Sequence, residues 1–313
     1  MRRTAALIFC LVLTPAVFVA QTPPTQGRGG QANRPPLTPE QQAAQKARQA
    51  ASAPDAPRPI DMLDTVWIEE QTWMETRDAI NAGKTTAIIG SGGLEQNGPY
   101  NANGKHNFVL RATCEATARR LGNALCAPIV TLEPGNTERQ GLTPGSVFIS
   151  ADTFKAVLVD MASSLKSMGF VNIAMIADSG GNVNGMKEAV AVLNTKWQGT
   201  PARAFYVDEY YEEDKWSFHF LKTIGINQVP DVQSATRYDI HDDYHYEALV
   251  ALTDPKLVRA EQRIKAKKFV INGYEIGSVA KLLENARKIQ DHRATITANA
   301  IRKYIAAPRS TQQ

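Results

Sequence analysis

Two glycine-rich stretches carry the side chains best suited to chemistry. The first, GSGGLEQNGPYNANGKHNF at 90–108, contains the carboxylate of Glu95 and the imidazole of His106. The second, DSGGNVNG at 178–185, opens with Asp178 and Ser179 ahead of two glycines. Carboxylates and imidazoles bind divalent metals and transfer protons, so both stretches are candidate parts of an active site.

Both stretches follow segments that the sequence predicts to be strands. From about residue 60, apolar runs alternate with amphipathic segments, which predicts parallel β-α-β units and a sheet covered on both faces. The predicted strands are 85–90, 124–130, 171–178 and 202–210. The predicted helices are 71–82, 107–122, 151–168 and 183–197, followed by a long amphipathic helix at 278–306. Ligands of such sheets bind beyond the carboxyl ends of the strands, so the two stretches are expected to meet at one edge.

Four segments resemble, in order and spacing, the creatininase family of metal-dependent amidohydrolases. GGLEQNGPYNANGKHNFVL (92–110) is similar to the family's Glu-x-His-Gly-Pro-His signature with its following Asp, and IADSGGNVNGM (176–186) to its Asn-Gly-His-Gly-Gly-Asn signature. PGSVFIS (144–150) is similar to a Pro-Gly-Thr segment, and HDDYHYEALVALTDPKLV (241–258) to the segment that contains His-Ala-Gly. The resemblance covers roughly residues 63 to 260. It implies a single three-layer α/β/α domain with a mostly parallel sheet, a hexameric assembly, and divalent zinc or manganese that activates water.

The resemblance carries over to the family's ligand positions unevenly. Glu95 stands at the first ligand Glu, Asn97 at a ligand His, and His106 at the bridging Asp. The other matched positions are Ser179 at the ligand His of the second signature, Gly181 at a ligand Glu, and His241 at the His of His-Ala-Gly. The family's two-metal site is therefore not intact by this alignment.

The leading hypothesis is an amidohydrolase that uses one divalent ion, zinc or manganese, against a C–N bond of a small linear or cyclic amide. Glu95 and His106 would hold the ion, with His245 as a tentative third ligand. His241 would transfer the proton, and Asp178 and Ser179 would hold an oxyanion or an anionic substrate group. The expected substrate-binding residues are Asn97, Gly180, Gly181, Asn182, Tyr210 and Trp216.

Two alternatives stay open. The first is a metal-free protein, or pseudoenzyme, that binds a small ligand on the same fold. The second is a serine hydrolase, because Ala177 to Gly181 resemble a nucleophile elbow and the order Ser179, Asp208, then His241 or His245 suits a catalytic triad.

The remaining sequence indicates an exported protein. Residues 1–20 have the two arginines, apolar run and small residues of a signal peptide, which predicts secretion or a periplasmic location; an uncleaved membrane anchor is the alternative. A flexible leader rich in Pro, Gln and Ala is expected at 21–58, the domain at 59–306, and a flexible tail at 307–313.

Net charge and hydropathy bear on the expected binding partners, and the cysteines on a possible disulfide. The net charge of +4 is dispersed over 313 residues, so nucleic acid is not an expected partner. No later stretch is long and apolar enough to span a membrane. The family resemblance implies a small-molecule substrate as the partner. Cys114 and Cys126 both lie in apolar surroundings, and buried free thiols are favoured over a disulfide.

Overall fold

The computed structural model describes residues 36–138, 144–212, 214–228 and 243–308, without the side chains of 214–218. The predicted signal peptide, His241 and the side chain of Trp216 lie outside this part. The helices are α1 (Pro39–Ala51), α2 (Trp73–Asn81), α3 (Lys105–Leu121), α4 (Ala151–Met168), α5 (Asn182–Lys196), α6 (Asp208–Tyr211), α7 (Asp214–Thr223), α8 (Tyr244–Thr253), α9 (Ala260–Lys265) and α10 (Val279–Ala306). The strands are β1 (Thr86–Ser91), β2 (Ala124–Cys126), β3 (Glu133–Pro134), β4 (Phe148–Ile149), β5 (Asn172–Ala177), β6 (Arg203–Tyr206), β7 (Val270–Ile271) and β8 (Tyr274–Glu275). Two short 3₁₀ helices are η1 (Ile68–Glu70) and η2 (Pro255–Val258).

The chain divides into two compact units, with the boundary after Pro57. In the first unit, α1 begins after Thr38, whose side chain and that of Gln41 form a reciprocal capping box. Residues 39–51 of the expected flexible leader therefore form a helix. Its Ala, Gln and Arg content favours a helix, although none of its residues is buried.

The second unit is built on a four-stranded sheet in the order β2-β1-β5-β6, with every pairing parallel. β1 and β5 pair along their whole length, from Thr86 opposite Asn172 to Ser91 opposite Ala177. Because these neighbouring strands end at the same level, the two glycine-rich stretches leave the sheet at one edge. The short parallel pair β3–β4 forms a separate two-stranded sheet.

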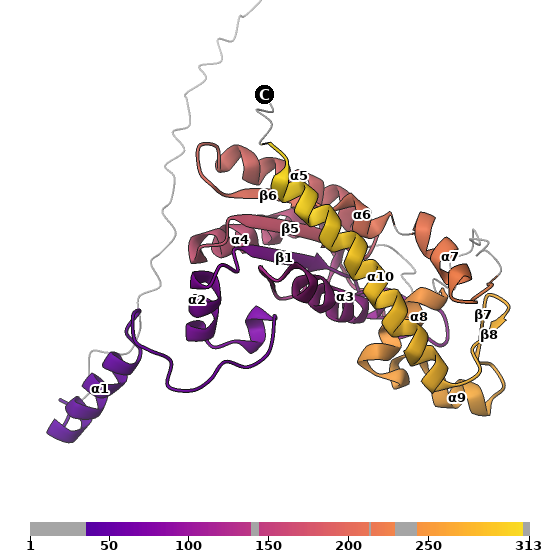
Figure 1. The fold of residues 1–313 in the computed structure, drawn as a ribbon, viewed down its shortest axis with the longest axis horizontal. Helices are drawn as coiled ribbons and strands as arrows, with labels where there is room; N and C mark the ends of the chain where they lie inside the picture. The colour runs from indigo at the N-terminus through magenta and orange to yellow at the C-terminus, as the bar shows by residue number, and fades with distance from the viewer. Residues whose placement is uncertain (1–35, 139–143, 213, 229–242, 309–313) are drawn as a thin grey trace, which may run out of the picture. The chain divides into compact units, whose positions relative to one another are not determined.

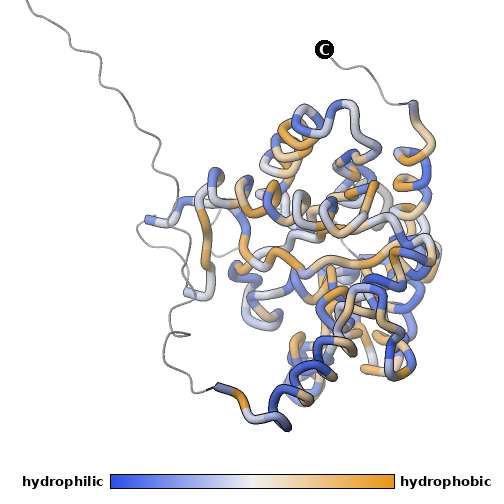
Figure 2. Tube along the Cα trace, turned by 90° about the vertical axis from the view of Figure 1, so that its left-hand side faces the viewer, coloured by the Kyte–Doolittle hydropathy of each residue, from blue (hydrophilic) through white to orange (hydrophobic). Residues whose placement is uncertain are grey.

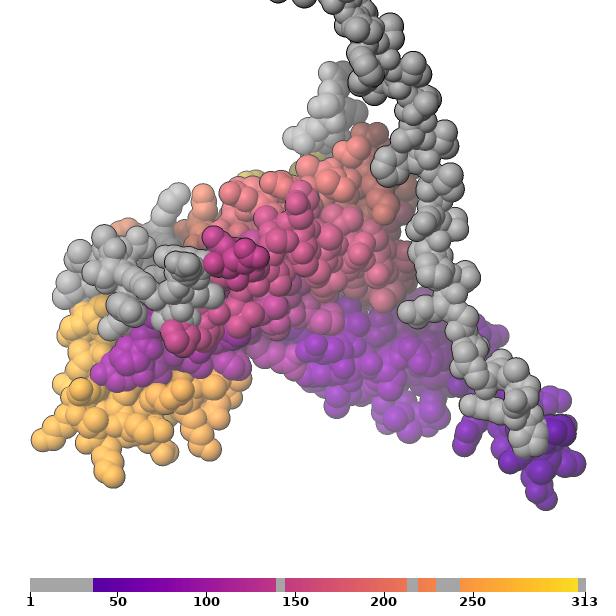
Figure 3. Space-filling model, turned by 180° about the vertical axis from the view of Figure 1, so that it is seen from behind, coloured from indigo at the N-terminus to yellow at the C-terminus, as the bar shows by residue number. Residues whose placement is uncertain are grey.

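Helices cover both faces of the central sheet and complete three layers (Figure 1). On one face, α3 contacts β1, β2 and the long helix α10. On the other face, α4 and α5 contact each other and β5, and they form the middle of the surface seen from behind in Figure 3. The predicted three-layer α/β/α architecture with a mostly parallel sheet is confirmed. Within the described residues, no helix is long and apolar enough to cross a membrane.

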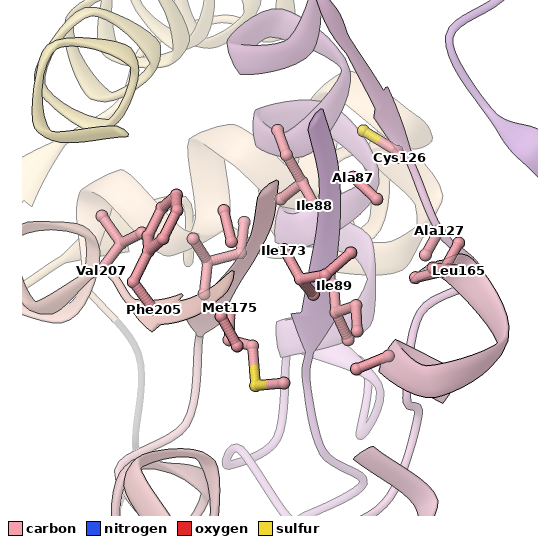
Figure 4. Packing of buried hydrophobic residues seen from close by; sticks show 14 of the residues in the cluster. Ala87, Ile88, Ile89, Cys126, Ala127, Leu165, Ile173, Met175, Phe205 and Val207 are labelled. Carbon is pink, nitrogen blue, oxygen red and sulfur yellow. The ribbon is translucent and has the colours of Figure 1, made fainter. Parts of the chain in front are cut away.

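The core lies between these layers. Figure 2 shows hydrophobic residues concentrated along the strands and on one side of the surrounding helices. Ile88, Ile89, Ile173 and Met175 are fully buried in it, and Phe205 of β6 packs beside them (Figure 4). A second apolar cluster gathers around α8 and the first half of α10. The buried strands explain the unbroken apolar runs in the sequence, because both faces of a parallel sheet are covered.

Three local predictions need correction. The strand predicted at 202–210 ends at Tyr206, and Tyr210 lies in α6, where Asp208 supplies an acidic first turn. The strand predicted at 124–130 ends at Cys126, with one isolated bridge at Val130. The favoured free thiols are wrong, because packing of α3 on β2 brings Cys114 and Cys126 within 6.3 Å between Cα atoms and they form a disulfide.

Candidate active site

The loop after β1 is folded around a buried amide. Asn97 is fully buried and donates from Nδ2 to the backbone oxygens of Glu95 at 3.0 Å and Ala102 at 3.2 Å. The Glu95 N–H in turn donates to the backbone oxygen of Asn103 at 3.0 Å. Asn97 was expected to contact substrate. Its amide group donates hydrogen bonds that hold this loop in place, and this fixes the backbone position from which the Glu95 side chain extends.

His106 lies in the first turn of α3 and contacts a carboxylate through each ring nitrogen. Nε2 is 2.8 Å from Oε1 of Glu95, and Nδ1 is 2.7 Å from Oδ1 of Asp178. The imidazole is buried, whereas the Glu95 side chain is 20% exposed. The structure therefore brings together Glu95, His106 and Asp178 as expected from the sheet, in a line that runs from solvent into the protein.

Asp178 is the inner end of this line and is completely buried. Its Oδ2 accepts a hydrogen bond from the Tyr210 hydroxyl at 2.8 Å and lies 3.0 Å from the Arg293 guanidinium. Burial raises the pKa of Asp178, but the charge of Arg293 and the contact with His106 outweigh it, so the pKa is lowered overall. Tyr210 is fully buried and positions Asp178, and its expected contact with substrate stays a prediction.

The charge balance of the site depends on His106. Burial and the charge of Lys105 lower its pKa, but the hydrogen bonds to Asp178 and Glu95 outweigh both and raise it overall. Only a protonated imidazole can donate to two ionised carboxylates at once. Lys105, itself buried, places Nζ 3.8 Å from Glu95 Oε1 and 4.6 Å from the ring centroid of Tyr246.

A third carboxylate, which the sequence analysis missed, lies at the same edge. Glu133 of β3 is 4% exposed and accepts a hydrogen bond from the Ser179 hydroxyl. Burial raises its pKa, with a further increase from the charge of Glu95, while the Ser179 hydrogen bond opposes the shift. β3 is two residues long, so its sequence gives no periodic signal that would have identified it.

Asn182 joins the two glycine-rich turns. It is fully buried at the start of α5, and Nδ2 donates to the backbone oxygens of Ser91 at 3.0 Å and Gly92 at 2.6 Å. Both donors hold the end of β1, and the expected contact of Asn182 with substrate stays a prediction. Gly180 and Gly181 are exposed beside it, and their expected contact with a ligand also stays a prediction.

Comparison with known proteins identifies the family. The family model for creatininase, described as creatinine amidohydrolase, matches residues 69–296. The chain belongs to the creatininase family. A search of curated proteins found no match.

Solved structures agree on the fold. A crystal structure of creatinine amidohydrolase superposes with a TM-score of 0.58 at 17% identity, covering 79% of this chain and all of the other. Structures titled creatininase Mn and a point mutant of creatininase of Zn-Zn type each give 0.57 at 17% identity, covering 78% of this chain and all of the other. At this identity the likeness establishes the fold, while the titles show that zinc or manganese accompanies these creatininases.

The family's two-metal centre does not fit the residues of this chain. Asn97 directs its donors to the backbone, Ser179 to Glu133, and Gly181 has no side chain. Among the residues that the structure describes, no three His, Cys, Asp or Glu side chains form a group that could hold an ion.

A single ion would have to replace the proton between two of these side chains. Nε2 of His106 and Oε1 of Glu95 lie 2.8 Å apart in a hydrogen bond, and Asp178 holds Nδ1 of the same ring. A carboxylate on the far nitrogen is the usual partner of a histidine that binds a metal, because it fixes the orientation of the ring.

The tentative third ligand is not brought to this pair. His245 is buried in α8 and its Nδ1 lies 2.7 Å from Oδ1 of Asp243. The Tyr246 ring contacts both His245 and His106, at centroid distances of 4.0 Å and 5.8 Å. His245 therefore belongs to a neighbouring cluster.

The serine-hydrolase alternative is not supported by the geometry. A nucleophile elbow places its serine in a strained turn, yet the non-glycine residues with positive φ in the described chain are Arg259, Lys267 and Asn272. Asp208, the expected acid of the triad, pairs at 2.7 Å with Lys187. The Ser179 hydroxyl donates to a carboxylate, Glu133, and not to an imidazole of the described residues.

Proposed function

We propose that this chain hydrolyses a C–N bond in a small linear or cyclic amide. Membership of the creatininase family supports this class of reaction. The observation that carries the proposal is the line Asp178–His106–Glu95, which lies where neighbouring parallel strands end and emerges at a partly exposed carboxylate.

One divalent ion, zinc or manganese, would be held by Glu95 and His106. Such an ion supplies a water of lowered pKa and polarises the amide carbonyl. The chain's own residues prepare the site. Asp178 holds the imidazole in one orientation, and Arg293 keeps Asp178 ionised. Glu95 is the exposed end of the line, where a proton can be exchanged with substrate or solvent.

We further propose that the protein is exported and works outside the cytoplasm, as a homo-oligomer by analogy with the family. The N-terminal sequence supports export. The Cys114–Cys126 disulfide supports it independently, since disulfides form and persist in oxidising compartments.

The first test is the metal content of the mature protein. Wild type, Glu95→Ala and the control Glu138→Ala would be purified without chelator or affinity metal and measured by plasma mass spectrometry. Glu138 is an exposed carboxylate in the segment after β3. We expect about one zinc or manganese per chain in wild type and the control, and less than about a tenth of that in Glu95→Ala. A folded wild type that takes up neither metal contradicts the proposal.

The competing function is metal-free binding of a small ligand. It is favoured by one observation: Lys105 and His106 already lie against Glu95, and Arg293 lies against Asp178, so protein cations already accompany both carboxylates. In that case Glu95→Gln would keep ligand affinity within about twofold. In the metal-dependent hydrolase the same variant loses metal and turnover together.

A further inference from the structure

Glu133 differs from the other two carboxylates of the site in its partners. Glu95 lies against Lys105 and His106, and Asp178 lies against His106 and Arg293. Among the described residues, Glu133 has a hydrogen bond from the Ser179 hydroxyl and no cation within ion-pair distance. His106 and Lys105 lower the pKa of Glu133 only from a distance, and a buried carboxylate without a direct cationic partner is costly, which points to a charge that comes from outside the chain.

The second oxygen of Glu133 is available for that partner. Oε2 accepts from Ser179, whereas Oε1 is buried and has no hydrogen-bond partner among the described residues. An ionised carboxylate accepts hydrogen bonds and donates none. Burial raises the pKa of Glu133, and a hydrogen-bond donor would stabilise its ionised form; an N–H or O–H group of a ligand would supply that donor.

Two glycines lie close against this carboxylate. A Cβ at Gly93 would lie 2.8 Å from the carboxyl carbon of Glu133, and one at Gly181 would lie 3.2 Å from Oε2. Neither glycine has a positive φ, so backbone conformation does not require glycine at either position. What favours glycine at both positions is the closeness of the Glu133 side chain. Gly180 and Gly181 are exposed, which opens this side to a small molecule.

We propose that Glu133 and Ser179 form a subsite that binds a cationic N–H group of the ligand, such as an amidinium or an ammonium. A cationic donor is favoured over a neutral amide N–H because a charge-assisted hydrogen bond is about twice as strong and offsets the desolvation of the carboxylate. The assignment deepens the proposed function by naming a substrate class, but it concerns binding and is tested without turnover.

The experiment compares two probes of nearly equal shape, acetamidinium and acetamide. Each is titrated into the full mature protein and followed by ligand-observed NMR. The variants are Glu133→Gln, which keeps the shape of the side chain, and the matched control Glu138→Gln, an exposed carboxylate five residues away. We expect wild type and the control to bind acetamidinium at least tenfold more tightly than acetamide. Glu133→Gln should lose at least tenfold in affinity for acetamidinium and little for acetamide.

A second variant tests the proposal independently, in case Glu133→Gln does not fold. Gly181 has a φ of −59° and a ψ of −26°, which any residue adopts, and a Cβ there would lie 3.2 Å from Oε2 of Glu133, so Gly181→Ala should fold with a small shift of that carboxylate. Its methyl group would crowd Glu133 and weaken acetamidinium binding. Equal affinity for the two probes in wild type, or unchanged acetamidinium affinity in either variant, would overturn the proposal.

Metal content separates this proposal from the proposed hydrolase. Glu133→Gln should retain the metal content of wild type, whatever that content is. If it loses metal, Glu133 is a metal ligand and the recognition role is wrong. If wild type binds no metal but discriminates between the probes as expected, the hydrolase proposal fails while the subsite stands.

Discussion

Residue types and their spacing predict only some of the contacts of His106. The sequence predicts that it meets Glu95 and Asp178, because two neighbouring strands deliver all three to one edge. The sequence does not reveal that both ring nitrogens face carboxylates, nor that Lys105 lies beside Glu95. Those contacts depend on rotamers and loop paths, which have no periodic signature. They decide the protonation of the site and therefore deserve a direct measurement.

The free energy of unfolding should depend on pH through His106. Burial lowers its pKa in the folded protein, but the hydrogen bonds to Asp178 and Glu95 outweigh burial and raise the pKa overall. The stabilisation is therefore complete below the unfolded pKa of about 6.5 and is lost as pH rises through the folded value. Metal-free wild type should lose up to about 1.4 kcal/mol per pH unit in this window relative to His106→Gln, measured by denaturant titration from pH 5.5 to 9.5.

His292 provides the matched control. Burial lowers its pKa, so it is neutral in both folded and unfolded states above pH 6.5. His292→Gln should therefore follow wild type in parallel over the alkaline range. If His106→Gln also stays parallel to wild type, the imidazole is not protonated between its carboxylates.

At the scale of the elements, the sequence predicted most of what positions the site. The helices predicted at 107–122, 151–168 and 183–197 occur within two residues of their expected bounds. Amphipathic periodicity and caps such as Ser150 define them well. β3 was not predicted, because two residues cannot show a period, and Glu133 was missed with it. Asn182 was assigned to substrate binding from the sequence. Its burial depends on the register of β1 against β5, which the sequence does not reveal.

Asn182 should be a structural link between β1 and α5. Asn182→Ala removes the donors to the backbone oxygens of Ser91 and Gly92. We expect a loss of about 1–3 kcal/mol in the free energy of unfolding, since a buried carbonyl without a donor carries that penalty. The control is Asn184→Ala, an exposed position on the same helix, which should change stability by less than about 0.5 kcal/mol. Equal effects of the two variants would argue against the link.

At the scale of the whole molecule, the site is assembled from distant parts of the chain. Glu95, Glu133 and Asp178 follow three different strands or belong to them, and Arg293 reaches Asp178 from α10. Fold-level rules predict that loops meet at the carboxyl edge of the sheet. They do not predict which charged residue of a long helix turns inward, because the exposed and buried faces of α10 both contain polar residues. Arg293 could therefore be found only from the tertiary packing.

The disulfide between α3 and β2 should contribute to the stability of the whole fold. Cys114 and Cys126 close a short loop, 12 residues apart, and such a cross-link stabilises by about 2–4 kcal/mol, chiefly by restricting the unfolded chain. Protein lacking residues 1–20 should show no free thiol in denaturant before reduction and two after it. Refolding under reductant should lower the melting temperature, whereas Cys114→Ala/Cys126→Ala should melt at one temperature with or without reductant. Two free thiols in protein recovered from the periplasm would remove both the cross-link and its support for export.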